Sequence, residues 1–211
     1  SDILNLASSY TYKNEDAGYT PTTGPSPNNP TVRTLQRKFD DFVSVKDFGA
    51  KGDGSTDDTA AINRALFELY CREPYEGARK ALHFPAGRYI VSDFVKVPPN
   101  ATLIGEGPRN TIIEQIGDPD TVYAVIQIAD SKQQIEGSIG TNGASLPSDI
   151  SISDMGLRAN LDGIYINKCR RITLSRVRIE GPESFPNGNL SSVDLASPDS
   201  SIGINISGSD V

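Results

Sequence analysis

The sequence has one histidine, two cysteines and no apolar run that approaches a membrane span. A helix that crosses a bilayer needs about 20 consecutive apolar residues, so no membrane insertion is predicted. Cys71 and Cys169 show no Cys-x-x-Cys spacing, which leaves a zinc site without support. They could pair only with Cα atoms within about 6 Å, so two reduced, packed thiols are predicted. The lone His83 favours a structural role and argues against serine- or cysteine-type triads, which need a histidine base.

Basic charge is also scarce. The 211 residues include 20 Lys and Arg against 27 Asp and Glu, a formal net charge of -7. This balance is unfavourable for electrostatic binding to nucleic acid or to an anionic membrane. The first residues lack the basic and apolar segments of a signal peptide. No cofactor or metal motif is present, so none is expected.

Residues 1–42 are predicted to form an extended arm and connector. Prolines and glycine interrupt residues 1–30 too often for regular structure; the prolines are Pro21, Pro25, Pro27 and Pro30. In the connector, Leu35 and Phe39 are four residues apart, which favours one helical turn. When ordered, such an arm needs a surface to lie on, either its own domain or a neighbouring subunit. Residues 43–211 are predicted to form the main domain.

The main domain opens with a stretch from Val43 to Leu69 that predicts three elements. Apolar residues at 43, 45 and 48 favour a short strand, and Gly49–Gly54 favours a turn over a phosphate-binding loop. Ser55–Leu69 predicts an amphipathic helix, because apolar residues recur at intervals of three and four: Ile62, Ala65, Leu66 and Leu69. Ser55 with Asp58 fits an acidic capping box, and Asp57 is a second candidate N-cap. Capping is favoured over proton sharing or calcium binding for the Asp57–Asp58 pair.

Short strands bounded by turn residues follow this helix. A strand, a turn and a second strand are predicted over residues 82–91, and further strands at residues 94–97, 102–104, 111–113 and 122–128.

The second half of the chain contains an internal repeat. Four apolar residues recur 22 positions later in the same spacing: Ile150, Ile152, Met155 and Leu157 match Ile172, Leu174, Val177 and Ile179. The period-two alternation breaks once in each copy, as where a strand turns a corner. A Gly-Ile-x-Ile string at Gly163 recurs 40 positions later at Gly203, which leaves room for a loop over Gly181–Ser200. A period near 22 with several short strands predicts a β-solenoid, with the helix covering its first coil.

The string DFGAKGDGSTDDTAAI at Asp47–Ile62 and the string LHFPAGRYIVS at Leu82–Ser92 resemble the opening of pectate-lyase-like right-handed parallel β-helix proteins. Phage tailspikes and tail fibres are the relatives most similar in appearance. The resemblance implies the N-terminal part of a trimeric virion protein. Such a protein attaches through its N-terminal region to another tail or baseplate protein and recognises host-surface polysaccharide. A secreted polysaccharide lyase or glycoside hydrolase, and a purely adhesive β-helix, remain alternatives.

The catalytic residues stay unknown. Glycosidases use two carboxylates about 5 Å or about 6.5–9.5 Å apart, and the residues available for such chemistry are Asp154, Arg176, Arg178, Glu180 and Glu183. Arginines alternate with apolar residues between 170 and 178 and predict an exposed basic stripe, for which a solvated outer face is the simplest interpretation: Arg170, Arg171, Arg176 and Arg178. No Asn-Thr-Asp, Gly-His-Gly or Arg-Ile-Lys string of the polygalacturonase type occurs, so the segment is expected to be mainly structural.

Overall fold

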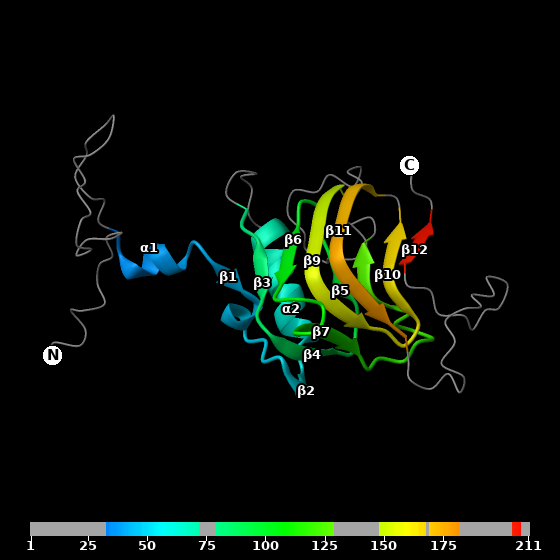
Figure 1. Cartoon of the computed structure of the whole chain (residues 1–211). Helices are drawn as coiled ribbons and strands as arrows, with labels where there is room; N and C mark the ends of the chain where they lie inside the picture. Colours follow the sequence, from blue (N-terminus) through cyan, green and yellow to red (C-terminus); the bar gives the residue numbers. More distant parts are fainter. Residues whose placement is uncertain (1–32, 72–78, 129–147, 168, 182–203, 208–211) are drawn as a thin grey trace. The chain divides into compact units, whose positions relative to one another are not determined.

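The computed structural model describes residues 33–71, 79–128, 148–167, 169–181 and 204–207 (Figure 1). The chain divides into two compact units, one that ends at Val43 and one that begins at Ser44. The described part of the first unit contains the short helix α1 (Leu35–Phe39), whose N-cap Thr34 accepts a hydrogen bond from the backbone of Arg37. No described helix is long and apolar enough to cross a membrane. The predicted arm at residues 1–32 lies outside the described residues.

The strand predicted at the start of the main domain is wrong beyond Ser44. β1 covers only Val43–Ser44, and Val45–Phe48 forms a 3-10 turn, η1. The cause is a reciprocal cap. The Ser44 hydroxyl accepts the N–H of Lys46, while the Asp47 carboxylate accepts the N–H of Ser44 at 2.8 Å. Such a capping box satisfies backbone donors locally and turns the chain out of the extended conformation.

The predicted helix begins four residues later than Ser55. Residues Asp53–Asp57 form strand β2, α2 covers Thr59–Leu66, and a wider turn, η2, completes the segment at Phe67–Cys71. The Asp53 carboxylate accepts the N–H groups of Ser55 and Thr56, which holds this stretch out of a helix. The capping box from Ser55 to Asp58 is therefore wrong. The N-cap position is Asp58, whose side chain makes no capping hydrogen bond. Asp57, the second candidate, lies one residue earlier and accepts the N–H of Thr59 at 3.0 Å.

The remaining elements are short strands, and every predicted one is present. They are β3 (Leu82–Phe84), β4 (Gly87–Val91), β5 (Val95–Lys96), β6 (Thr102–Gly105), β7 (Thr111–Gln115), β8 (Ala124–Ile128), β9 (Ser148–Arg158), β10 (Asp162–Asn167), β11 (Arg170–Glu180) and β12 (Ile204–Ser207). From β2 onward, the described strands pair in parallel. One sheet follows the order β3-β6-β9-β7-β4-β2 with β11 beside β9, and the other follows β12-β10-β8-β5.

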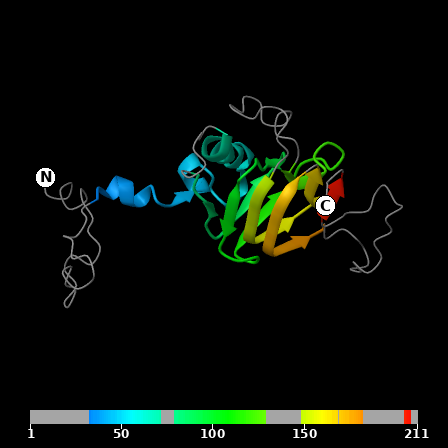
Figure 2. The ribbon, with the colours of Figure 1, turned by 90° about the horizontal axis from the view of Figure 1, so that it is seen from above.

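The strand register confirms both repeats. Ile172 lies opposite Ile150 and Ile179 opposite Leu157 across the β9–β11 pair, which is the offset of 22 found in the sequence. Ile204 lies opposite Ile164 across the β10–β12 pair, which is the offset of 40. Successive coils thus stack in parallel, and Figure 2 shows the strands following one another from the side of α2 towards β11. The mostly-β coiled architecture predicted from the sequence is present in the described residues.

The break in alternation is a left-handed residue in each coil. Asp154 has φ 61° and Arg176 has φ 51°, and these residues are 22 positions apart. A second pair of the same kind occurs at Asp149 (φ 59°) and Arg171 (φ 51°). Neither Asp154 nor Arg176 belongs to the regular pairs of the register. The corner of one coil therefore lies on the corner of the next.

The core consists of columns of apolar side chains that run through the coils. One column passes from Leu82 through Leu103 to Ile152, all with no exposed surface. A second column passes from Tyr89 through Ile113 to Leu157 and is equally buried. Burying each such side chain contributes about 1.5–3 kcal/mol. Every coil therefore depends on the coil beside it for its core.

Helix α2 buries Ile62, Ala65 and Leu66 and directs polar side chains at the backbone of the first coils. The Asn63 amide donates to the carbonyl of Phe94 at 2.8 Å and accepts the N–H of Lys96 at 2.9 Å. In the following turn, the Tyr70 hydroxyl bonds the backbone of Thr102. These side chains bind backbone groups that a neighbouring strand would otherwise bind.

Candidate functional site

A ladder of alternating charges crosses the outer face of the larger sheet. Arg88 on β4, Glu114 on β7, Arg158 on β9 and Glu180 on β11 supply one charge from each of four strands. Arg88 Nε donates to Glu114 Oε2 at 2.6 Å. Arg158 bridges the two acids, with 3.2 Å from its Nη1 to Glu114 and 3.2 Å from its Nε to Glu180. Each coil is therefore linked to the next by an ion pair.

The strand register explains why these groups meet. Glu114 lies opposite Arg158, and Arg158 lies opposite Glu180, so the three side chains form one outward column. The neighbouring column contains Ile112, Gly156 and Arg178. Because Gly156 has no side chain, the backbone carbonyl of Pro108 approaches this second column between Ile112 and Arg178.

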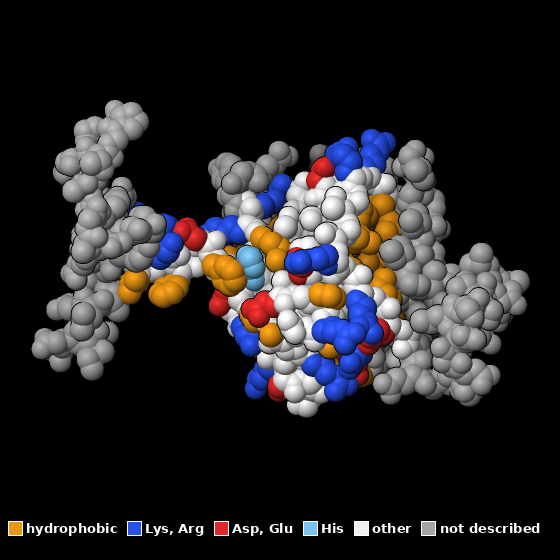
Figure 3. All heavy atoms as spheres, viewed as in Figure 1, with side chains coloured by type: hydrophobic (Ala, Val, Ile, Leu, Met, Phe, Trp, Pro, Cys, Tyr) orange, Lys and Arg blue, Asp and Glu red, His pale blue; other side chains and the backbone are white. Residues whose placement is uncertain are grey.

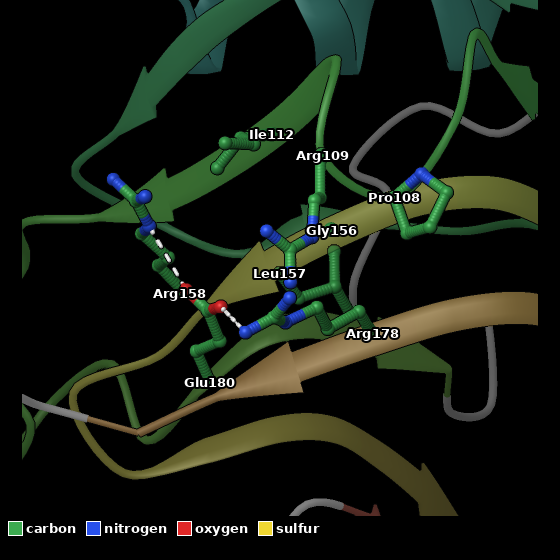
Figure 4. Close-up of a pocket in the computed structure, with 8 residues that line it drawn as sticks. All are labelled: Pro108, Arg109, Ile112, Gly156, Leu157, Arg158, Arg178 and Glu180. Carbon is green, nitrogen blue, oxygen red and sulfur yellow. Dashed lines mark hydrogen bonds and ion pairs between the residues drawn. The ribbon is translucent and has the colours of Figure 1, made fainter.

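A pocket of about 250 Å³ lies beside this contact (Figure 4). Its lining comes from β7, β9, β11 and the β6–β7 loop: Pro108, Arg109, Ile112, Gly156, Leu157, Arg158, Arg178 and Glu180. Small-molecule sites usually enclose about 300–1,000 Å³. The pocket therefore suits one small group of a larger ligand. Figure 3 shows Lys and Arg side chains gathered on the face that carries these strands.

Close backbone packing holds the β6–β7 loop at the edge of the pocket. The N–H of Gly107 donates to the carbonyl of Asp154 at 2.8 Å. A Cβ on Gly105 would lie 2.2 Å from that carbonyl oxygen, and a Cβ on Gly156 would lie 2.4 Å from the carbonyl oxygen of Pro108. Both glycines are therefore required where loop and strand meet, and this contact positions Arg109.

Arginine dominates the electrostatics of the pocket. The hydrogen bond from Arg88, together with those from Arg158, lowers the pKa of Glu114 despite partial burial, so Glu114 stays ionised at neutral pH. The hydrogen bond to Glu114 likewise raises the pKa of Arg158. Arg178 pairs with Glu180 at 2.5 Å. Among the described residues, Arg109 makes no hydrogen bond or ion pair, and Figure 4 shows it turned towards the same space as Arg178.

The residues proposed from the sequence for carbohydrate chemistry are divided by the structure. Arg178 and Glu180 both line the pocket. Asp154 and Arg176 instead form an ion pair with each other at the stacked corners, where Asp154 Oδ1 is buried and has no hydrogen-bond partner among the described residues. Glu183 lies outside the described residues.

The predicted basic stripe is exposed, as expected for a solvated face, but it is largely neutralised. Arg170, Arg171, Arg176 and Arg178 are all exposed on β11. Three of the four pair with acids: Arg171 with Asp149, Arg176 with Asp154, and Arg178 with Glu180. The stripe on β11 is therefore not a continuous positive surface.

The other polar candidates have structural surroundings. The Asp58 carboxylate is buried and accepts the N–H groups of Lys51 and Gly52 at 2.7 and 2.9 Å, so it closes the glycine turn. His83 is partly buried on β3, and burial lowers its pKa. The described residues contain no group of three or more His, Cys, Asp or Glu side chains that could hold a metal. Cys71 and Cys169 are both buried.

Sequence reasoning missed Arg88, Arg109, Glu114 and Arg158. The pairing of Arg158 with Glu180 was visible in principle, because these opposite charges are separated by the same 22 positions as the apolar repeat. Arg109 lies in a loop outside the repeat, so no periodic signal indicated it.

Comparison with known proteins identifies relatives of two kinds. The family model for "Rhamnogalacturonase A/epimerase, pectate lyase-like" matches residues 42–193. The pre-neck appendage protein of Bacillus phage B103 is 30% identical over 125 residues, 59% of this chain and 12% of that protein. The preneck appendage protein of Bacillus phage PZA is 39% identical over 72 residues, 34% of this chain and 7% of that protein. Alginate lyase 7 of Azotobacter vinelandii is 34% identical over 123 residues, 56% of this chain and 13% of that protein.

Solved structures support the fold. ORF18 of Geobacillus virus E2 aligns with a TM-score of 0.52 at 21% identity, over 72% of this chain and 30% of that one. The chain thus spans only a small part of the curated relatives it matches. The resemblance seen in the two sequence strings, including the similarity to phage appendage proteins, is confirmed. The chain belongs to the rhamnogalacturonase A/epimerase, pectate-lyase-like family.

Proposed function

We propose that this chain is the N-terminal part of a phage tailspike or tail fibre, in which it builds the first coils of a right-handed parallel β-helix. The observation that carries the proposal is the similarity to the B103 pre-neck appendage protein over 125 residues. In this proposal the parent protein is a trimer in the virion. It attaches through its N-terminal region to another tail or baseplate protein and recognises host-surface polysaccharide.

The segment itself has a mainly structural role in this proposal. Helix α2 acts as the cap of the first coils, because Asn63 binds the backbone of β5, the last strand in the order of its sheet. The inter-coil ion pairs support the same role, since they connect four strands that are neighbours in the sheet: β4, β7, β9 and β11. A cap and a cross-linked stack are what a rigid shaft requires.

The trimer is tested by the solution mass of the full chain and of a chain that begins at residue 43, measured by light scattering. A trimeric full chain that becomes monomeric without residues 1–42 supports subunits held together by the arm. Circular dichroism of the shortened chain is the control, because its β content should be retained. A monomer for both chains at high concentration contradicts the trimer within this segment.

Glycan recognition is tested separately, with a panel of immobilised bacterial surface polysaccharides and the heat-unfolded chain as control. Selective retention by one class of polymer supports recognition within this segment. Equal, weak retention of all polymers would place recognition in another part of the parent protein.

A second candidate is a secreted polysaccharide lyase or glycoside hydrolase. The specific observation in its favour is the 34% identity to alginate lyase 7 over 123 residues. An enzyme would cleave the polysaccharide, whereas a structural virion segment would not. Incubation with alginate and polygalacturonate, followed by chain-length analysis, should leave both polymers intact if this segment is structural. Binding without cleavage would favour the third class, an adhesive β-helix.

A further inference from the structure

We propose that the pocket over Gly156 binds one anionic group, a carboxylate or a phosphate, carried on a sugar of a larger glycan. The inference rests on the proposed glycan recognition and adds to it the chemistry of one contact. It is argued from the three arginines of the lining: Arg109, Arg158 and Arg178.

The first argument is charge. Three guanidinium groups line this pocket against a single carboxylate, Glu180, in a chain whose formal net charge is -7. Arg109 and Arg178 face the same space, although like charges in proximity repel each other. An anion between them would remove that repulsion.

The second argument is that the arginines differ in availability. Arg158 is held between Glu114 and Glu180 and serves the ladder. Arg109 makes no hydrogen bond or ion pair with any other described residue. A guanidinium presents a planar fork that matches both carboxylate and phosphate oxygens. Arg109 is therefore the expected anchor.

The third argument is that the Glu180 carboxylate would compete with a bound anion for the same arginines. Its carboxylate already accepts Arg178 at 2.5 Å and Arg158 at 3.2 Å. An incoming anion must share Arg178 with this internal acid. Removal of the Glu180 charge should therefore strengthen anion binding, which a pocket for neutral sugar would not show.

The test uses the full chain and three small probes: a galacturonate trisaccharide, glucose 6-phosphate and a neutral galactose trisaccharide. Binding is followed by shifts of the arginine Nε–H signals in nuclear magnetic resonance. The two charged probes should shift Arg109 and Arg178, and the neutral probe should not. Their relative affinities decide between carboxylate and phosphate.

Variants of single residues test whether the probes bind in this pocket. Arg109→Ala should weaken binding of the preferred probe about tenfold or more, because a hydrogen bond to a charged group is lost. Arg170→Ala is the matched control, since Arg170 is exposed on the same sheet, has no ion pair among the described residues and does not line the pocket. Glu180→Gln should strengthen binding severalfold, and an unchanged spectrum elsewhere would show that the fold is retained.

Three results would overturn the proposal: equal binding of the neutral trisaccharide, an equal loss in Arg170→Ala and Arg109→Ala, or weaker binding in Glu180→Gln. Failure of the pocket is distinguishable from failure of the proposed function. A chain that retains a surface polysaccharide in the panel, unaffected by Arg109→Ala, recognises glycan at another site.

Discussion

Asn63 and Lys96 are joined by a hydrogen bond of 2.9 Å from a strand backbone to a helix side chain. The same amide also donates to the carbonyl of Phe94. One side chain on α2 thus makes the two hydrogen bonds that a further β-strand would make with β5.

Replacing Asn63 should therefore destabilise the fold from its first coils. Asn63→Ala leaves a donor and an acceptor of β5 unpaired, and a loss of about 1–3 kcal/mol in the free energy of unfolding is expected. Asn63→Asp keeps the acceptor for Lys96 but replaces the donor to the Phe94 carbonyl with a second acceptor, so it should also lose stability. Chemical denaturation of the three proteins measures these losses, and an Asn63→Ala variant as stable as the native chain would contradict the proposed capping role of α2.

The stability of the main unit should fall in acid, with Glu114 as one cause. The folded pKa of Glu114 lies below its usual value, chiefly through the Arg88 hydrogen bond. Its contribution is therefore present above the unfolded pKa of about 4.3 and disappears as the pH falls through the lower folded value. Glu114→Gln should cost about 1 kcal/mol at pH 7 and progressively less below pH ~4.

Urea titrations of both proteins at a series of pH values measure this difference. The difference in the free energy of unfolding between the native chain and Glu114→Gln should shrink in acid. A difference that stays constant from neutral to acidic pH would show that the charge of Glu114 does not contribute to stability. The same difference in the free energy of unfolding should decrease in high salt, because salt screens ion pairs that are partly exposed.

The stacked corners predict a sharp contrast between neighbouring residues. Arg176 has φ 51°, a conformation that β-branched residues disfavour strongly. Arg176→Val should lower the free energy of unfolding by about 1–2 kcal/mol relative to Arg176→Asn, because asparagine tolerates this conformation. Ser175→Val, one position earlier on the same strand, is the control and should be close to neutral. Equal effects at 175 and 176 would count against the corner.

Cys71 should be unreactive in the native chain. Burial raises the pKa of its thiol to about 11, so only about a thousandth of it is thiolate at pH 8. Iodoacetamide should label Cys71 at pH 8 only after denaturant is added, and peptide mass spectrometry identifies the site. Labelling of the folded protein at the rate of a small free thiol would contradict its buried position.

The sequence predicted the parts of this fold that repeat. Ile150 and Ile172 carry the period because each coil must bury an apolar side chain where its neighbour does. The start of α2 escaped prediction because two local hydrogen-bond systems compete with the helix: Asp53 binds the backbone at Ser55, and Asp58 binds the backbone at Lys51. Helical periodicity does not register such contacts.

The candidate pocket was only half predictable. Arg178 and Glu180 could be named because they lie on a repeating strand. Arg109 could not, because its position depends on how closely the β6–β7 loop approaches β9 at Gly105 and Gly156. That approach depends on tertiary packing, and its only sign in the sequence is the two glycines that permit it.

The parallel register from β3 through β6 and β9 to β11 has a mechanical consequence. Backbone hydrogen bonds between coils point along the direction in which the coils stack. A pull along that direction places the full load on every junction in series, so the weakest junction opens first and the coils separate one by one. A push along it presses backbone against backbone over the whole cross-section, and the same column then resists as a strut.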